Sequence, residues 1–444
     1  PTLTKEEQQD PNNYYNPKTL DELAQEYPLL DWAAFLAALG SPNATTLIVA
    51  EPRFYPALPA ILQATPMETI RDYLTIQALW SYSGLLSEDL DDLAFEFQNT
   101  VYGVEQQEPD DRRALDTVNG VMGDPVGKIY VAQYFPPAAK AQITALVDRL
   151  IAAYRDRLAQ LTWMSPETKE KALEKLTKIR VKVGYPDADK WQTYEDLEVG
   201  DSYFRTYANA FEAYWKEQFA RIGQPVDKDE WFTLPQVVNA YYNPTSNEIV
   251  FPAGILQPPF FDYQAAPASN YGAIGVVIGH EITHGFDLSG SQYDGDGNLV
   301  DWWTDADRAA FEALNDEVVA QYSAIEVAPD LFVDGQFTVT ENVADLGGIQ
   351  VAYEALQAEL AANGDPGPIE GFSQPERFFI AMAQVWHMQV RDEELVRRVK
   401  TDSHAPGFVR AVQPSRNTDA FHDVFGTQPG DAMYLAPEER VVIW

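Results

Sequence analysis

The chain has 444 residues, no cysteine, and 68 acidic against 31 basic residues, which gives a formal net charge of −37. A surface this negative repels phosphate backbones and anionic lipid, so the composition argues against a nucleic-acid-binding or membrane-surface protein. The lack of cysteine excludes disulfides, thiol catalysis and thiolate metal sites, so a transition metal would need histidine or carboxylate ligands.

Most of the first 200 residues are predicted to be helical. Apolar residues recur at i, i+3, i+4 spacing over three stretches, residues 20–39, 56–93 and 137–161. A further helix is predicted to begin at Ser165, which can act as its cap, with Pro166 in the first turn. No apolar run approaches the ~20 residues needed to span a bilayer, so no transmembrane segment is predicted in this chain.

After residue 231 the sequence pattern changes from helical to mixed helix and strand. Two β-rich runs, residues 237–242 and 248–251, flank a turn, and a proline-rich loop then leads to a helix over residues 275–286. The polar stretch 198–202 is typical of a boundary. We therefore expect a helical domain over residues 1–202 and a mixed domain over residues 203–444, and a fold that is mainly α with a smaller β component (α+β).

Two of the five histidines stand in the run His280-Glu-Ile-Thr-His284. Positions i and i+4 of a helix lie one turn apart on one face, so both imidazoles can reach one ion. Glu281 then sits beside the metal, where it can take a proton from a water molecule. The alternative is a chance match on a structural helix, but the apolar lead-in at residues 274–278 favours a buried metal-binding helix.

A catalytic zinc site needs a third protein ligand, which must here be a histidine or a carboxylate. The best candidates are Glu341 and Asp345, which are also spaced i, i+4. One carboxylate could bind the metal while the other accepts a hydrogen bond from a ligand histidine. Spacing alone does not rank the two, and acidic pairs on helices are often only solvated.

Longer runs carry a resemblance to a known family. They include Val238-Asn-Ala-Tyr, Ile249-Val-Phe-Pro-Ala-Gly-Ile-Leu-Gln-Pro-Pro-Phe-Phe, Val277-Ile-Gly-His-Glu-Ile-Thr-His-Gly-Phe-Asp, Glu341-Asn-Val-Ala-Asp, Thr401-Asp-Ser-His-Ala-Pro-Gly and the terminal Trp444. On these motifs the chain resembles the neprilysin family of zinc metallopeptidases, also named for endothelin-converting enzyme and bacterial oligopeptidase O. The resemblance runs nearly from end to end, but family members are usually longer at the N-terminal side.

The resemblance implies a gluzincin-type, thermolysin-like catalytic domain and an all-helical capping domain that enclose a cavity, with the first residues crossing from one domain to the other. It implies one catalytic Zn²⁺ held by His280, His284 and Glu341. Glu281 would be the base that activates water, and Asp345 would support a zinc-binding histidine.

The resemblance also implies residues that contact the substrate. Asn239 and Ala240 match the pair that binds the peptide backbone as an added strand, a mode that gains main-chain hydrogen bonds. His404 would stabilise the transition state and Arg410 would contact substrate, although His404 alone would be read as a surface-loop histidine. Four residues would line the pocket for the residue after the cleaved bond (P1′): Ile255, Phe260, Val277 and Trp386.

We therefore expect a zinc-dependent endopeptidase that acts on short or flexible peptides and prefers a large hydrophobic residue at P1′. The alternatives are an inactive zinc-bearing scaffold and a secreted metalloprotease with an open cleft. The expected partners are peptide substrates and an associated N-terminal segment of the same precursor. The expected location is extracellular or periplasmic, with the cytoplasm as the alternative.

Overall fold

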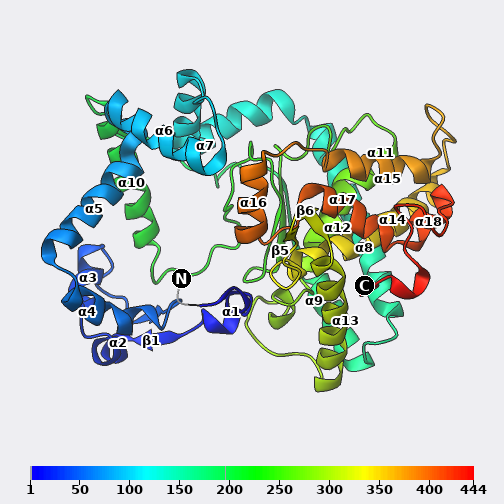
Figure 1. Cartoon of the computed structure of the whole chain (residues 1–444), viewed down its shortest axis with the longest axis horizontal. Coiled ribbons are helices and arrows are strands. Elements are labelled where there is room, and N and C mark those ends of the chain that lie inside the picture. Colours follow the sequence, from blue (N-terminus) through cyan, green and yellow to red (C-terminus); the bar gives the residue numbers. More distant parts are fainter. Residues whose placement is uncertain (1–2, 196) are drawn as a thin grey trace. The chain divides into compact units, whose positions relative to one another are not determined.

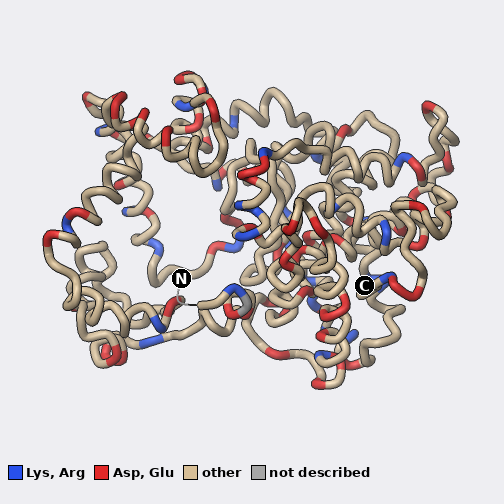
Figure 2. Tube along the Cα trace, in the orientation of Figure 1, with Lys and Arg blue, Asp and Glu red and all other residues tan. Residues whose placement is uncertain are grey.

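The computed structural model of the chain describes residues 3–195 and 197–444, and these divide into two compact units (Figure 1). Unit 1 comprises residues 1–126 and 191–229, and unit 2 comprises residues 127–190 and 230–444. Helices make up most of both units, so the expected mainly helical fold with a smaller β component is confirmed. Acidic residues predominate along the trace of each unit (Figure 2). Among the described residues, no helix combines the length and apolarity of a membrane span.

Unit 1 is built from helices and one short strand pair. The two strands, β1 (Pro17–Thr19) and β2 (Thr46–Ile48), pair antiparallel with Lys18 opposite Leu47. The helices are α1 (Lys5–Gln8), α2 (Leu20–Glu26), α3 (Trp32–Ala38), α4 (Phe54–Ala64), α5 (Met67–Tyr82), α6 (Glu88–Tyr102), the first part of α7 (Asp110–Tyr134), and α10 (Tyr203–Ala220). Short 3₁₀ turns lie at Pro11–Asn13 (η1) and Ser83–Leu85 (η2).

The hydrophobic core of unit 1 is small. Its buried cluster consists of Leu23, Tyr27, Trp32 and Val49. Large apolar side chains on α5 and α6 are instead exposed: Tyr73, Leu74, Ile76 and Leu93 each have relative exposures between 59% and 62%. Unit 1 therefore presents more apolar surface than a small self-contained domain normally does.

Unit 2 contains the remaining elements. Its α-helices are the end of α7, α8 (Pro137–Gln160), α9 (Pro166–Thr177), α11 (Pro267–Asn270), α12 (Val276–His284), α13 (Asp305–Ser323), α14 (Val339–Asn363), α15 (Gln374–Val385), α16 (Asp392–Thr401), α17 (Gly407–Arg416) and α18 (Asp419–Phe425). A π-helical segment, η3 (Tyr271–Gly275), leads into α12, and 3₁₀ turns lie at η4 (Gly290–Gln292) and η5 (Pro437–Glu439). Its strands are β3 (Arg180–Gly184), β4 (Tyr241–Asn243), β5 (Glu248–Pro252), β6 (Glu326–Ala328) and β7 (Leu331–Phe332).

A three-stranded sheet in unit 2 has the order β3-β5-β4. The central strand β5 is buried along its length and pairs parallel with β3, with Val181 opposite Ile249, and antiparallel with β4, with Tyr242 opposite Ile249. Strand β4 is therefore an edge strand of this sheet. The residues that precede it, Val238 and Asn239, are exposed.

The site is built where α12 and α14 pack closely against one another. Glycines set their crossing, because a Cβ added at Gly279 would lie 2.8 Å from the carbonyl oxygen of Gly348. A Cβ added at Gly348 would lie 2.8 Å from the main-chain nitrogen of His280. Larger residues at either position would push the helices apart, so the two glycines hold the motif His280–His284 against the start of α14.

The division into units differs from the expected boundary at residue 202. Residues 127–190 pack in unit 2 because α8 contacts α12 and α14, and because β3 pairs with β5. Conversely, α10 belongs to unit 1, although it follows the expected boundary. Composition and local periodicity carry no information on such non-local pairing. They therefore predict the boundary where the polarity of the sequence changes.

Candidate metal centre

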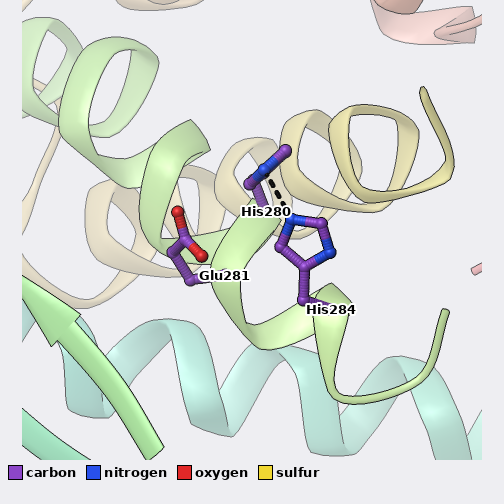
Figure 3. A group of neighbouring side chains, drawn as sticks. All are labelled: His280, Glu281 and His284. Atoms are coloured by element: carbon purple, nitrogen blue, oxygen red, sulfur yellow. Dashed lines mark hydrogen bonds between the residues drawn. The ribbon is translucent and has the colours of Figure 1, made fainter. Parts of the chain in front are cut away.

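The motif His280-Glu-Ile-Thr-His284 lies on α12, as the sequence predicts. Its two imidazoles point toward one another, with their Nε2 atoms 2.9 Å apart (Figure 3). Each residue of the set His280, Glu281 and His284 offers a possible ligand atom, and these atoms all lie within 4.8 Å of one another. The i, i+4 spacing therefore brings both histidines to one point.

The other ring nitrogen of each histidine contacts a carboxylate. His280 Nδ1 lies 2.8 Å from Asp345 Oδ1, and His284 Nδ1 lies 2.6 Å from Asp287 Oδ2. A carboxylate accepts a hydrogen bond, so each Nδ1 carries the proton and each Nε2 presents a lone pair. This is the arrangement of imidazoles that bind a metal.

Glu341, at the start of α14, brings a third electron-rich atom to the same point. Its Oε2 lies 3.3 Å from His280 Nε2 and 3.5 Å from His284 Nε2. This oxygen is buried, yet no described group donates it a hydrogen bond of good geometry. Burial favours the neutral acid, but the positive charge that these imidazoles carry when protonated holds the pKa of Glu341 well below its usual range, so the carboxylate is charged.

These three atoms fit a zinc ion. Ligand atoms about 2.0–2.1 Å from a tetrahedral zinc lie about 3.3 Å from one another, close to the separations of 2.9, 3.3 and 3.5 Å seen here. Two lone pairs and a carboxylate oxygen without a proper donor would repel one another without a cation between them. The donor set, two histidines and one glutamate, is one that catalytic zinc sites use.

Glu281 is the remaining acidic residue of the motif. It is buried on α12 and lines the same cavity as the three candidate ligands. Burial raises the pKa of Glu281, whereas the nearby imidazoles and Arg410 oppose this effect. A carboxylate with a raised pKa can accept a proton and release it again, as a general base must.

His404 approaches Glu341 from a loop before α17. Its Nε2 lies 3.1 Å from Glu341 Oε2, and its Nδ1 lies 2.8 Å from Asp402 Oδ1. The side chain is 44% exposed, unlike the imidazole of His280, which is 8% exposed. His404 therefore stands at the open side of the site with one ring nitrogen fixed and the other facing the cavity.

Arg410 packs against Asp345 and Trp386 in the wall of the cavity. It is buried, and its Nε and Nη2 donate to the two oxygens of Asp345 at 2.8 and 2.7 Å. Its guanidinium also lies 4.1 Å from the centre of the Trp386 ring. Arg410 thus fixes the carboxylate that holds His280 and supports a wall of the cavity, while contact with substrate stays a prediction.

A cavity of about 570 Å³ in unit 2 collects all of the residues that the sequence singled out. They line it together with Asp287, Tyr241 and Ser289. The four residues expected to form the P1′ pocket all line it: Ile255 and Phe260 from the loop after β5, Val277 from α12, and Trp386 from the end of α15. Asn239 and Ala240 line the cavity directly before the edge strand β4.

Sequence reasoning missed two residues that support the site, Asp287 and Asp402. Asp287 follows His284 by three residues, in the turn after α12, and Asp402 precedes His404 by two. The reasoning that linked Asp345 to a ligand histidine applies equally to both, so a search for acidic residues near each functional histidine would have found them.

The chain is similar to known peptidases. Two models of the peptidase family M13 match residues 1–186 and 239–441. The chain is 34% identical to rabbit (Oryctolagus cuniculus) neprilysin over 466 residues, which cover 100% of this chain and 62% of that protein. It is 33% identical to a neutral endopeptidase of Lactococcus lactis, covering 97% of this chain and 67% of that protein.

Two solved structures are also similar. The crystal structure of the Mycobacterium tuberculosis zinc metalloprotease Zmp1 with an inhibitor matches with a TM-score of 0.94 and 41% identity, over 100% of this chain and 68% of that one. PepO from Lactobacillus rhamnosis matches with a TM-score of 0.88 and 32% identity, over 100% of this chain and 69% of that one. The chain spans about 62% of the length of the neprilysins that it matches.

Proposed function

Since this chain belongs to peptidase family M13, we propose that it is a zinc-dependent endopeptidase that cleaves short or flexible peptides. The observation that carries the proposal is the convergence of His280 Nε2, His284 Nε2 and Glu341 Oε2 within 3.5 Å of one another. Glu281 and His404 line the same cavity, so the groups that hydrolysis needs meet in one place.

In the proposed mechanism, different residues bind zinc, transfer the proton and stabilise the oxyanion. His280, His284 and Glu341 would hold one zinc ion, which when bound polarises a carbonyl and makes water more acidic. Glu281 accepts a proton from the attacking water and returns it to the leaving amine. Although burial opposes it, Glu341 and Asp402 raise the pKa of His404, which favours the imidazolium. The Nε2–H of this imidazolium would face the cavity and donate to the carbonyl oxygen as negative charge develops there.

The peptide would bind along the strand edge. Asn239 and Ala240 precede β4, whose outer edge is unpaired within the described sheet, so an extended peptide can add there as a further strand. Ile255, Phe260, Val277 and Trp386 offer an apolar wall beside Glu281. We infer a preference for a large hydrophobic residue at P1′.

The test is hydrolysis by the purified full chain. Peptide cleavage should disappear with a chelator and return with zinc, at one zinc per chain. Stoichiometric zinc without cleavage, in a native preparation that still contains any associated segment of the precursor, would favour the alternative, an inactive zinc-bearing scaffold. Substrates of graded size would separate an enclosed site from an open cleft, since only an open cleft cleaves folded proteins.

The P1′ preference has its own test. A peptide series that varies only the residue after the cleaved bond should be cleaved fastest with Phe or Leu there. Trp386→Ala should lower this discrimination by roughly 10-fold or more, because one lost apolar contact in a pocket is worth about 1–3 kcal/mol. Equal cleavage of all peptides by the unaltered chain would contradict the assignment of the pocket.

We also propose that the apolar side chains of α5 and α6 contact a further segment of the precursor. The supporting observation is the exposure of Tyr73, Leu74 and Ile76 on one short stretch. The chain alone, after refolding, should then bind zinc but aggregate and cleave peptides slowly. Full activity from a soluble monomer of 49.8 kDa would contradict this partner.

The location of the protein stays a proposal. We retain an extracellular or periplasmic location, with the cytoplasm as the alternative. Fractionation of the source cells, with the chain detected by antibody, decides between them.

A further inference from the structure

A buried lysine lies behind the candidate metal centre. Lys175, in the last turn of α9, is only 1% exposed. Burying an ammonium group costs several kcal/mol unless its donors are satisfied. Its Nζ donates to two main-chain carbonyls, those of Gly290 at 2.6 Å and Tyr293 at 2.7 Å.

Both carbonyls belong to the turn that follows the metal-binding helix. Gly290 begins η4, and its own N–H donates to Asp287 Oδ1 at 2.7 Å. The N–H of Ser289 donates to the same oxygen at 2.8 Å. The other oxygen of Asp287 holds His284 Nδ1 at 2.6 Å.

Gly290 connects Lys175 to Asp287, the carboxylate that supports the candidate ligand His284. Gly290 offers its carbonyl to Lys175 and its N–H to Asp287. No larger residue fits there, since a Cβ at Gly290 would lie 1.8 Å from the carbonyl oxygen of His284. A shift of this turn would therefore move the main-chain N–H groups of Ser289 and Gly290, which orient Asp287 toward the imidazole of His284.

The charges around the lysine favour the same arrangement. Burial lowers the pKa of Lys175 to about 7, whereas the carboxylates of Asp287 and Asp294 favour its charged form. The lysine main chain is itself anchored, because its carbonyl accepts a hydrogen bond from the side chain of Asn247 at 3.0 Å. The ammonium is thus held in place from both ends of the residue.

We propose that Lys175 is a positioning residue for zinc binding: through Gly290 it fixes Asp287, and through Asp287 it fixes the orientation of His284. This inference rests on the proposed zinc site. Lys175 touches neither substrate nor metal, and it acts from a helix more than a hundred residues before the motif.

The test is a double-mutant cycle of zinc affinity in the full chain, measured by chelator competition. Lys175→Met keeps the apolar stem and removes the donors, and should raise the zinc dissociation constant by roughly 3- to 10-fold. Asp287→Ala should raise it by the ~10- to 100-fold typical of residues that hold a ligand histidine. In the Asp287→Ala background, Lys175→Met should add less than about twofold, since the two act in series.

A matched control separates positioning from simple loss of stability. Thr168→Val, on the same helix, removes a buried hydrogen bond to Asp307 that has no link to η4. It should lower the melting temperature but leave zinc affinity unchanged. The absorption spectrum of the Co²⁺-substituted chain should shift with Lys175→Met and not with Thr168→Val.

Two results would contradict a positioning role for Lys175. An unchanged zinc affinity for Lys175→Met, or an equal loss in both backgrounds, would overturn the inference. If Lys175→Met does not fold, Lys175→Arg replaces it, since arginine keeps the positive charge but places its donors differently. Its effect on the zinc dissociation constant should again be smaller in the Asp287→Ala background than in the unaltered chain. Failure of the proposed function looks different: the unaltered chain would then bind no zinc, or would keep it after His284→Ala.

Discussion

Asp307 and Glu341 are both carboxylates inside unit 2, and they differ in how their oxygens are satisfied. Asp307 accepts hydrogen bonds from the hydroxyls of Ser165, Thr168 and Thr304, and from the main-chain N–H of Ser165. Glu341 Oε2 faces three imidazole nitrogens within 3.5 Å and accepts no hydrogen bond of good geometry from the described residues.

The difference separates a structural carboxylate from one that binds an ion. The donors around Asp307 are neutral, and they join the beginnings of α9 and α13, whose caps are Ser165 and Thr304. Two neighbours of Glu341, His280 and His284, are bases whose Nδ1 atoms already donate to Asp345 and Asp287. A complete hydrogen-bond shell indicates a role in stability, whereas lone pairs that converge without donors indicate a site that can bind a cation.

The largest expected effect comes from removing Glu341. Glu341→Ala should abolish stoichiometric zinc binding, because it removes one of only three protein ligands. Asp345→Ala should weaken zinc binding only by about 10- to 100-fold, since it removes a support of His280. Metal analysis after dialysis checks both variants. The reverse order would mean that the two carboxylates have exchanged roles.

The next effect separates metal binding from catalysis. Glu281→Gln keeps the shape of the side chain and removes its basicity, so zinc should stay bound while kcat falls by roughly 10²- to 10⁴-fold. Metal content and turnover are measured on the same preparation. Near-normal turnover with stoichiometric zinc would exclude Glu281 as the base.

His404 tests the open side of the site. His404→Phe should lower kcat by roughly 10²- to 10³-fold, as expected for the loss of one donor to a developing oxyanion, with little change in zinc content. Asp402→Asn is the graded control: it weakens the hydrogen bond that orients His404 and should have a smaller effect. Loss of zinc from the His404 variant would instead make this residue a ligand.

The sequence predicted the local features well and the long-range ones only through resemblance. The capped start of α9 and the helical placement of Glu341 with Asp345 follow from capping and periodicity, and the structure has both. Strand β3 was missed because its five residues lie at the end of a helical stretch and gain their pairing from β5, far along the chain.

The candidate site shows the same limit. The i, i+4 spacing was enough to bring His280 and His284 together, because one helical turn fixes their distance. Spacing could not place Glu341 beside them, since that depends on the close crossing of α12 and α14 at Gly279 and Gly348. Lys175 left no signal at all, because its partners are main-chain carbonyls that any sequence would provide.

The smallest predicted effect concerns Asp307 and stability. Although burial favours the neutral acid, the hydroxyls of Ser165, Thr168 and Thr304 lower the pKa of Asp307 to about 2, below the ordinary value of 3.8. An unfolded chain therefore binds this proton first as the pH falls. The stabilisation, about 2 kcal/mol, is fully present above pH 3.8 and is lost as the pH falls through about 2.

Asp307→Asn should accordingly lower the free energy of unfolding by about 2 kcal/mol at pH 7, and the difference from the unaltered chain should shrink below about pH 4. Denaturant unfolding at a series of pH values measures this difference, which cancels the titration of other carboxylates. Zinc affinity should stay within about twofold at pH 7, since the hydrogen bonds of Asp307 reach no candidate ligand. If the difference in unfolding free energy did not change with pH, the hydroxyls would not stabilise the charged form of Asp307. If Asp307→Asn weakened zinc binding, Asp307 could no longer be called a purely structural carboxylate in contrast to Glu341.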